Sequence, residues 1–79
     1  MGIHFFEKLN KMSITVQLNG AEYILERGIT ILELLKFLSL NKDSVALEHN
    51  SMLVSKKEYQ NIYLQDKDQL EIVSIVGGG

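Results

Sequence analysis

The chain has 79 residues, two histidines and a formal net charge of −2. It has no cysteine, which excludes disulfides, thiolate nucleophiles and cysteine metal sites. The negative charge and the lack of a basic stripe argue against a nucleic-acid partner. The length allows one domain with a small core, and the apolar runs are too short to span a bilayer. Absence of cysteine also suits a reducing compartment, so we expect a soluble, cytoplasmic protein without metal.

The first 11 residues, MGIHFFEKLNK, have no clear period, and a regular pattern starts only after Met12. Three interpretations stay open for them: an upstream start, a flexible arm, or a short added helix that uses Ile3, Phe6 and Leu9. We expect a flexible extension over residues 1–11 and one folded domain over residues 12–79.

A hairpin is the first regular element. Residues 14, 16 and 18 are apolar and alternate with polar residues, which predicts a half-buried strand. Asn19-Gly20 tolerates the positive φ angles of a two-residue turn, so we expect an antiparallel return strand over residues 22–25.

A helix follows. Thr30 and Glu33 have the spacing of a capping box, in which each side chain bonds the backbone of the other. The apolar residues after Thr30 fall on one helical face, and Asn41 is expected to end the helix. The members of this face are Ile31, Leu34, Leu35 and Leu38.

The remaining elements are short. Turn residues separate them, and Ser55 and Glu58 repeat the capping spacing before Tyr59. In order, we expect a strand over 45–49, a turn at 50–51, a strand over 52–54, a helical turn over 55–58, a polar turn over 65–68 and a last strand over 70–76.

This order of elements predicts an α+β fold, with one main helix packed across a mixed sheet of four to five strands. The helix supplies the crossover that parallel neighbours need, so the first and last strands lie side by side. This is the β-grasp (ubiquitin-like) arrangement. The sequence ends in Val76, Gly77, Gly78 and Gly79, which would then continue directly from a central strand as an exposed tail.

Two interpretations of the glycines follow from the residues alone: an inert end, or a thin tail that enters a narrow partner site. Ordering three such residues costs roughly 3–6 kcal/mol, so a docking surface on the domain has to supply binding energy. If Leu70 and Ile72 face the helix, alternation directs Val73 and Ile75 to the opposite face. We expect Val73, Ile75 and Val76 to bind the partner.

Other candidate residues have plain structural interpretations. His49 is interpreted as a strand residue with a local hydrogen bond, because no acidic partner or nucleophile is readable near it. Asp66 and Asp68 are interpreted as turn residues with local side-chain bonds. Tyr59 and Phe37 are expected in the core or at its boundary. No phosphate-binding loop and no catalytic triad is visible, so the chain is not expected to be an enzyme.

From Met12 to Gly79 the sequence resembles the ThiS family of sulfur-carrier proteins of thiamin biosynthesis. The resemblance depends on the order and spacing of several segments rather than on any one of them. They are LNG at 18–20, TILELL at 30–35, VALEHN at 45–50, VSKKEY at 54–59, DKDQLEIV at 66–73 and the terminal VGGG. Ser51, Ser55 and Lys67 depart from the family's usual Gly, Pro and Gly, all at turns.

The resemblance implies a carrier whose reactive group is its own Gly79 carboxylate. An E1-like adenylyltransferase of the ThiF type would activate this group with ATP and Mg, a sulfur donor protein would provide sulfur, and the thiocarboxylate would serve a thiazole synthase of the ThiG type. No cofactor, nucleic acid or membrane is expected to bind the carrier itself. The expected site is therefore Gly79 with Gly77 and Gly78 as its tail.

Two alternatives stay open. The small subunit of molybdopterin synthase shares the fold and a Gly-Gly end, but it usually has prolines shortly before the glycines, and this chain has no proline. The other alternative is a non-catalytic ubiquitin-like interaction module with inert glycines.

Overall fold

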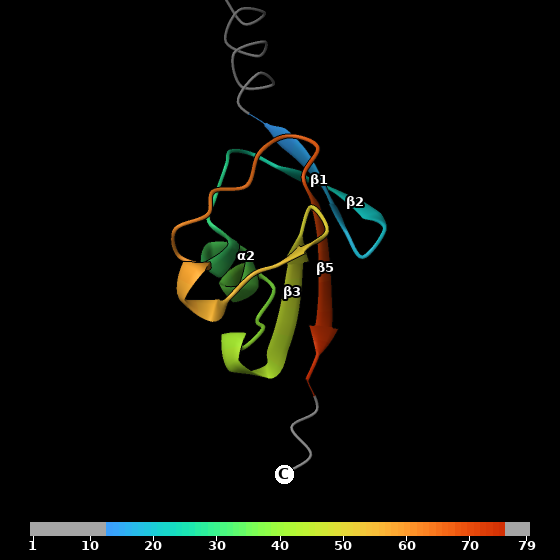
Figure 1. The fold of residues 1–79 in the computed structure, drawn as a ribbon. Coiled ribbons are helices and arrows are strands. Elements are labelled where there is room, and N and C mark those ends of the chain that lie inside the picture. The colour runs from blue at the N-terminus through green and yellow to red at the C-terminus, as the bar shows by residue number, and fades with distance from the viewer. Residues whose placement is uncertain (1–12, 76–79) are drawn as a thin grey trace, which may run out of the picture.

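The computed structural model describes residues 13–75. The predicted extension over residues 1–11 lies outside the described residues, and so do Val76 and the three glycines. Within 13–75 the sheet has five strands in the order β2-β1-β5-β3-β4. Figure 1 shows helix α2 on one side of this sheet.

The first hairpin consists of β1, Ile14–Leu18, and β2, Ala21–Leu25, paired antiparallel. Asn19 and Gly20 have φ angles of 51° and 84°, the left-handed values of a type I′ turn. Both the turn and the strands agree with the sequence prediction, with β2 one residue longer. Because β2 forms an edge of the sheet and is largely exposed, it contributes little to the core.

Helix α2, Ile31–Phe37, begins with the predicted capping box. The Glu33 N–H donates to Thr30 Oγ1 at 3.1 Å, and the Thr30 N–H donates to Glu33 Oε1 at 2.9 Å. This backbone bond from Thr30 is the largest effect that lowers the pKa of the Glu33 carboxyl. The helix buries Ile31, Leu34 and Leu35 against the sheet.

The prediction that Asn41 ends the helix is wrong. The helix stops at Phe37, and Ser39 takes a φ of 60° while the Leu40 N–H donates to the Leu35 carbonyl at 2.8 Å. This is the Schellman type of helix end, with serine where glycine is usual. Asn41 instead caps the next turn, accepting from the Asp43 N–H at 2.8 Å.

The second half of the fold follows the predicted order with short elements. Its members are the 3₁₀ turn η1, Lys42–Ser44; strand β3, Val45–His49; strand β4, Met52–Leu53; the 3₁₀ turn η2, Lys56–Glu58; and strand β5, Gln69–Ser74. The expected cap at Ser55 has no side-chain hydrogen bond. β5 pairs parallel to β1 and antiparallel to β3, so it is central, as predicted.

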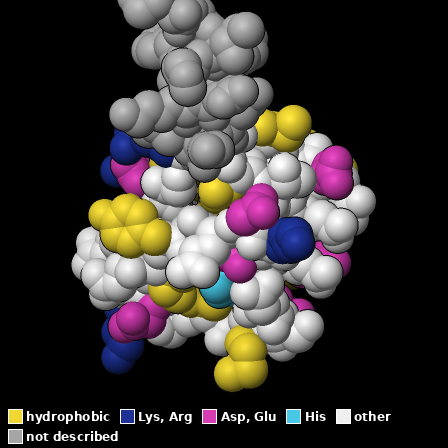
Figure 2. All heavy atoms as spheres, turned by 90° about the horizontal axis from the view of Figure 1, so that it is seen from above, with side chains coloured by type: hydrophobic (Ala, Val, Ile, Leu, Met, Phe, Trp, Pro, Cys, Tyr) yellow, Lys and Arg dark blue, Asp and Glu magenta, His cyan; other side chains and the backbone are white. Residues whose placement is uncertain are grey.

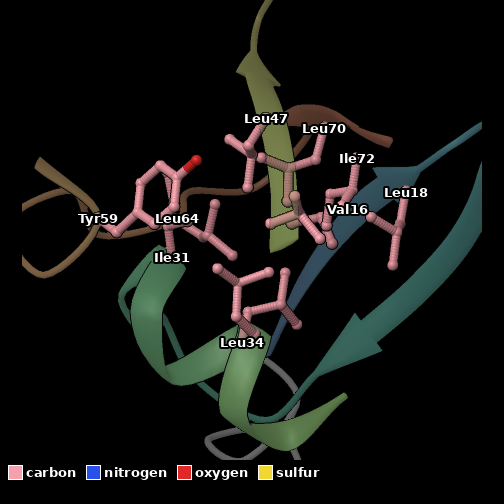
Figure 3. Packing of buried hydrophobic residues seen from close by; sticks show 11 residues of the cluster. Val16, Leu18, Ile31, Leu34, Leu47, Tyr59, Leu64, Leu70 and Ile72 are labelled. Carbon is pink, nitrogen blue, oxygen red and sulfur yellow. The ribbon is translucent and has the colours of Figure 1, made fainter. Parts of the chain in front are cut away.

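The core lies between α2 and the inner face of the sheet, where side chains of the helix and strands meet in one layer (Figure 3). Tyr59 is only 1% exposed and belongs to this core, as expected. Phe37 does not: it is 77% exposed, because it lies on the side of the helix away from the buried residues Leu34 and Leu35. The remaining buried apolar residues are Val16, Leu18, Ile31, Leu34, Leu35, Val45, Leu47, Leu64, Leu70 and Ile72.

Candidate functional site

The predicted reactive end, Gly79 with Gly77 and Gly78, lies outside the described residues, as does Val76. The structure describes the strand that leads to it. β5 is held on both sides near its start and by β3 along its length. Just after β5, the Ile75 N–H donates to the Ser44 carbonyl at 2.8 Å. The backbone is therefore hydrogen-bonded to the rest of the domain as far as Ile75, four positions before Gly79.

The two faces of β5 differ as alternation predicts. Leu70 and Ile72 are buried under α2, whereas the side chains of Val73 and Ile75 are 60% and 47% exposed. Val73 lies on the outer face, away from the helix, where no described element covers it. Binding of a partner by Val73 and Ile75 stays a prediction.

The outer face also holds residues that the sequence did not identify. Ala46 is the cross-strand partner of Val73, and Leu53 of the short strand β4 is 75% exposed. Together with Glu48 and Glu71, which are cross-strand partners of each other, they line a shallow groove of about 220 Å³. Alternation from the buried Leu47 could have placed Ala46 and Glu48; a strand of two residues gives no such signal for Leu53.

A polar cluster joins the turn after β3 to the start of β5. His49 Nε2 lies 2.8 Å from Asp68 Oδ2, and Asp68 also accepts from the Asn50 side chain at 3.1 Å and from the Gln65 N–H at 2.8 Å. Figure 2 shows the histidine ring at the surface beside a carboxylate. The expectation that His49 has no acidic partner is therefore wrong.

The same cluster corrects the interpretation of Asp68. Its contact with Gln65 is a local turn bond, as predicted, but its contacts with His49 and Asn50 connect segments far apart in sequence. Burial acts to raise the pKa of the Asp68 carboxyl, and the hydrogen bonds outweigh it, so its pKa lies below the ordinary value. Asp66 likewise accepts at long range, from the Thr15 N–H at 2.8 Å.

These contacts suit a structural clamp better than a catalytic site. Both carboxylate oxygens of Asp68 are bonded to groups of its own chain, Oδ1 to the Asn50 side chain and Oδ2 to His49 and to the Gln65 N–H. In the same range, no three His, Asp or Glu side chains are grouped so that they could hold a metal ion. Nor does any helix in this part of the chain have the length and apolarity needed to cross a membrane.

Comparison with known proteins gives consistent matches. The ThiS family matches residues 9–79. The chain is 37% identical over 65 residues to a sulfur carrier protein ThiS of Bacillus subtilis, covering 81% of this chain and 98% of that protein. It is 39% identical over 64 residues to a thiazole synthase of Magnetococcus marinus, covering 81% of this chain but 20% of that longer protein.

A solved structure supports the fold. The crystal structure of a thiamine biosynthesis protein (ThiS) from Geobacter metallireducens superposes with a TM-score of 0.73 at 22% identity, covering 84% of this chain and all of that one. This likeness confirms the β-grasp architecture predicted from the sequence.

Proposed function

This chain belongs to the ThiS family, and from that premise we propose that it carries sulfur for thiamine biosynthesis as a thiocarboxylate on Gly79. The observation that carries the proposal is the match to the Bacillus subtilis sulfur carrier across nearly the whole of that protein. The thiazole synthase match favours a ThiG-type enzyme as the acceptor of the sulfur over a molybdopterin synthase.

The chemistry requires activation because a carboxylate is a poor electrophile. A Gly79 carboxylate oxygen attacks the α-phosphate of ATP on an E1-like enzyme of the ThiF type, and Mg-bound pyrophosphate leaves. Sulfur provided by a donor protein, at the oxidation level of hydrosulfide, then attacks the acyl carbon, and AMP leaves with the former carboxylate oxygen. The product is a thiocarboxylate, and no residue of the carrier has to change its protonation state for catalysis.

The described part of the chain supports the role of a carrier rather than an enzyme. Within residues 13–75, His49 and Asp68 form one close, partly buried pair of titratable side chains. Their contacts fasten the turn at Asn50 to the start of β5. Activation and sulfur transfer are therefore assigned to partner enzymes, with the carrier acting as their substrate.

Binding of the activating enzyme is assigned to the outer face of the sheet. Val73 and Ile75 expose apolar surface next to the tail, and Ala46 and Leu53 extend it. Burying such surface yields about 25 cal/mol per Å², so a few side chains offset the cost of ordering the tail. Glu48 and Glu71 lie opposite each other within this face, where like charges destabilise, and a basic group of the partner would relieve them.

The experiment is intact-protein mass spectrometry after incubation with a ThiF-type enzyme, ATP, Mg and sulfide. We expect a mass increase equal to the exchange of one oxygen for sulfur, abolished by deletion of Gly79. Ile75→Glu should reduce the rate of this exchange at limiting enzyme while leaving thermal unfolding nearly unchanged; Glu22→Gln, on the distant edge strand, is the matched control. Unchanged mass in the parent protein, or full activity of the Gly79 deletion, would refute the proposal.

A further inference from the structure

The last strand, β5, is paired unequally along its two sides. On one side β3 pairs with residues 70–74. On the other side β1 pairs only with Gln69 and Leu70, because the chain turns back at Asn19. In Figure 1 the end of β5 that leads to the tail therefore continues past the β1–β2 hairpin.

The backbone groups of β5 alternate between these two sides. The Asn50 N–H donates to the Gln69 carbonyl at 2.8 Å, and the Ile75 N–H donates to the Ser44 carbonyl at 2.8 Å, so the odd-numbered residues of β5 direct their polar groups to β3. The even-numbered residues, which include Ser74, direct theirs to the other side.

On that other side, Asn19 takes the place of a further strand residue. Its N–H donates to the Leu70 carbonyl at 2.9 Å. Its side chain accepts from the Ile72 N–H at 2.7 Å and donates to the Ile72 carbonyl at 3.0 Å. Two positions later, no residue within 13–75 bonds the N–H or the carbonyl of the exposed Ser74. Ser74 thus offers one backbone donor and one acceptor at an open strand edge.

A hollow lined by four apolar and two uncharged polar residues lies beside this open edge, on the inner side of the sheet. Its volume is about 220 Å³. No charged side chain borders it, so an apolar side chain is the guest that it favours. Its lining residues are Leu18, Asn19, Leu40, Val45, Ile72 and Ser74. An open backbone edge beside such a hollow is the arrangement by which an extended peptide adds to a sheet, with main-chain bonds for affinity and a side-chain pocket for specificity.

We propose that the activating enzyme adds an extended segment to β5 at Ser74, on the side where β1 has ended. The segment's backbone bonds the N–H and carbonyl of Ser74, and an uncharged, apolar side chain of the segment enters the hollow next to Leu40. This inference rests on the proposed function, because it takes the enzyme that receives Gly79 as the partner.

The position of the edge supports that choice of occupant. Gly79 lies five positions after Ser74, and an extended chain of that length reaches at most about 17 Å. An active site that encloses Gly79 therefore has its entrance within this distance of the open edge. A bound strand at Ser74 would also fix the direction in which the tail leaves the sheet.

The test is amide hydrogen exchange by NMR, with and without a ThiF-type enzyme. In the free carrier, the Ser74 amide should exchange much faster than the amides of Val73 and Ile75, which face β3. Saturation with the enzyme should slow exchange at Ser74 at least tenfold. Fast exchange at Ser74 in the complex would overturn the inference. Protection that appears without enzyme, as carrier concentration rises, would assign the edge to a second copy and would also overturn it.

Two substitutions give an independent test. Ser74→Pro removes the N–H on the open side, while Ser74→Ala keeps it and removes only the hydroxyl. Loss of one hydrogen bond weakens binding by about threefold to tenfold, so Ser74→Pro should bind the enzyme that much more weakly than Ser74→Ala. Equal affinities of the two variants would contradict the inference; an unfolded Ser74→Pro leaves the exchange experiment to decide.

The two proposals fail differently. If sulfur is loaded on Gly79 and Ser74 stays unprotected in the complex, the added strand is wrong and the carrier function stands. If Ser74 is protected by the enzyme and no mass increase occurs, docking stands and the carrier function is wrong. If neither occurs, both are wrong.

Discussion

The two tight hairpin turns, Asn19-Gly20 and Asn50-Ser51, lie on opposite sides of β5 and use the same device. Each asparagine has a φ of 51°. Each donates its N–H to a carbonyl of β5, Asn19 to Leu70 and Asn50 to Gln69, at 2.9 and 2.8 Å. A side-chain oxygen of each accepts an N–H of β5 in return. The strand that leads to the tail is thus fastened by asparagine on both sides.

The turns differ in what the asparagine amide donates to and in the residue that follows. The Asn19 amide donates to a second backbone group of β5, whereas the Asn50 amide donates to the carboxylate of Asp68. Gly20 occupies its left-handed position without strain; Ser51 occupies the equivalent one with a φ of 73°. One turn therefore holds β5 through neutral bonds alone, and the other holds it through a charged group and a less favourable backbone.

Replacing each asparagine by glycine should have the largest effect on the free energy of unfolding. Glycine keeps the positive φ, so the substitution removes only the side-chain bonds. Asn19→Gly leaves the part-buried N–H and carbonyl of Ile72 without partners, so we expect a loss of about 2–3 kcal/mol in the free energy of unfolding. Asn50→Gly acts in a more exposed place and should cost about 1–2 kcal/mol. Urea unfolding measures both; a larger effect at Asn50 would contradict the comparison.

Acidification should weaken the Asn50-Ser51 turn more than the Asn19-Gly20 turn, because the asparagine of the former bonds the Asp68 carboxylate. The folded-state pKa of Asp68 lies below its ordinary value, so its contribution to stability is complete above an ordinary aspartate pKa of about 3.9 and is lost as pH falls through the lowered value.

Comparing Asp68→Asn with the parent protein tests this sign. The variant should be less stable near neutral pH, by about 1–2 kcal/mol, since hydrogen bonds to a charged group are stronger than neutral ones. The difference should shrink below the ordinary aspartate pKa. Asp66→Asn is the matched control, because Asp66 lies in the same turn and its exposed carboxylate accepts from the Thr15 N–H. A difference that stays constant with pH would show that Asp68 acts only through its shape.

The sequence predicts the architecture well because the hairpin, the capping box and the alternation in β3 and β5 are local signals that agree with one another. Asn19-Gly20, Thr30 with Glu33, and the buried side of β5 are all placed correctly. The end of α2 is predicted too late in the chain, because Ser39 adopts the left-handed conformation that ends the helix, and sequence patterns expect glycine or asparagine at such a position.

Long-range side-chain contacts could not be predicted from the sequence. His49 and Asp68 are 19 residues apart, and Asn19 and Ile72 are 53 apart, so no spacing rule connects them. The open edge at Ser74 is likewise a property of where β1 ends relative to β5, which depends on strand register. The face of Val73 is predictable, since alternation along one strand needs no partner.

The smallest effect concerns the second residue of each turn. Ser51→Gly should stabilise the protein by about 0.5–1 kcal/mol, because glycine adopts a positive φ without the steric cost that serine has there. Gly20→Ser should destabilise by a similar amount through the backbone alone, since a Cβ at Gly20 meets no atom within 4 Å. The double exchange should leave the free energy of unfolding nearly unchanged, because the two turns lie on opposite sides of β5 and their effects add. Thermal and urea unfolding of the three variants measures this, and a double variant that departs from the sum of the single ones would show that the turns are coupled through β5.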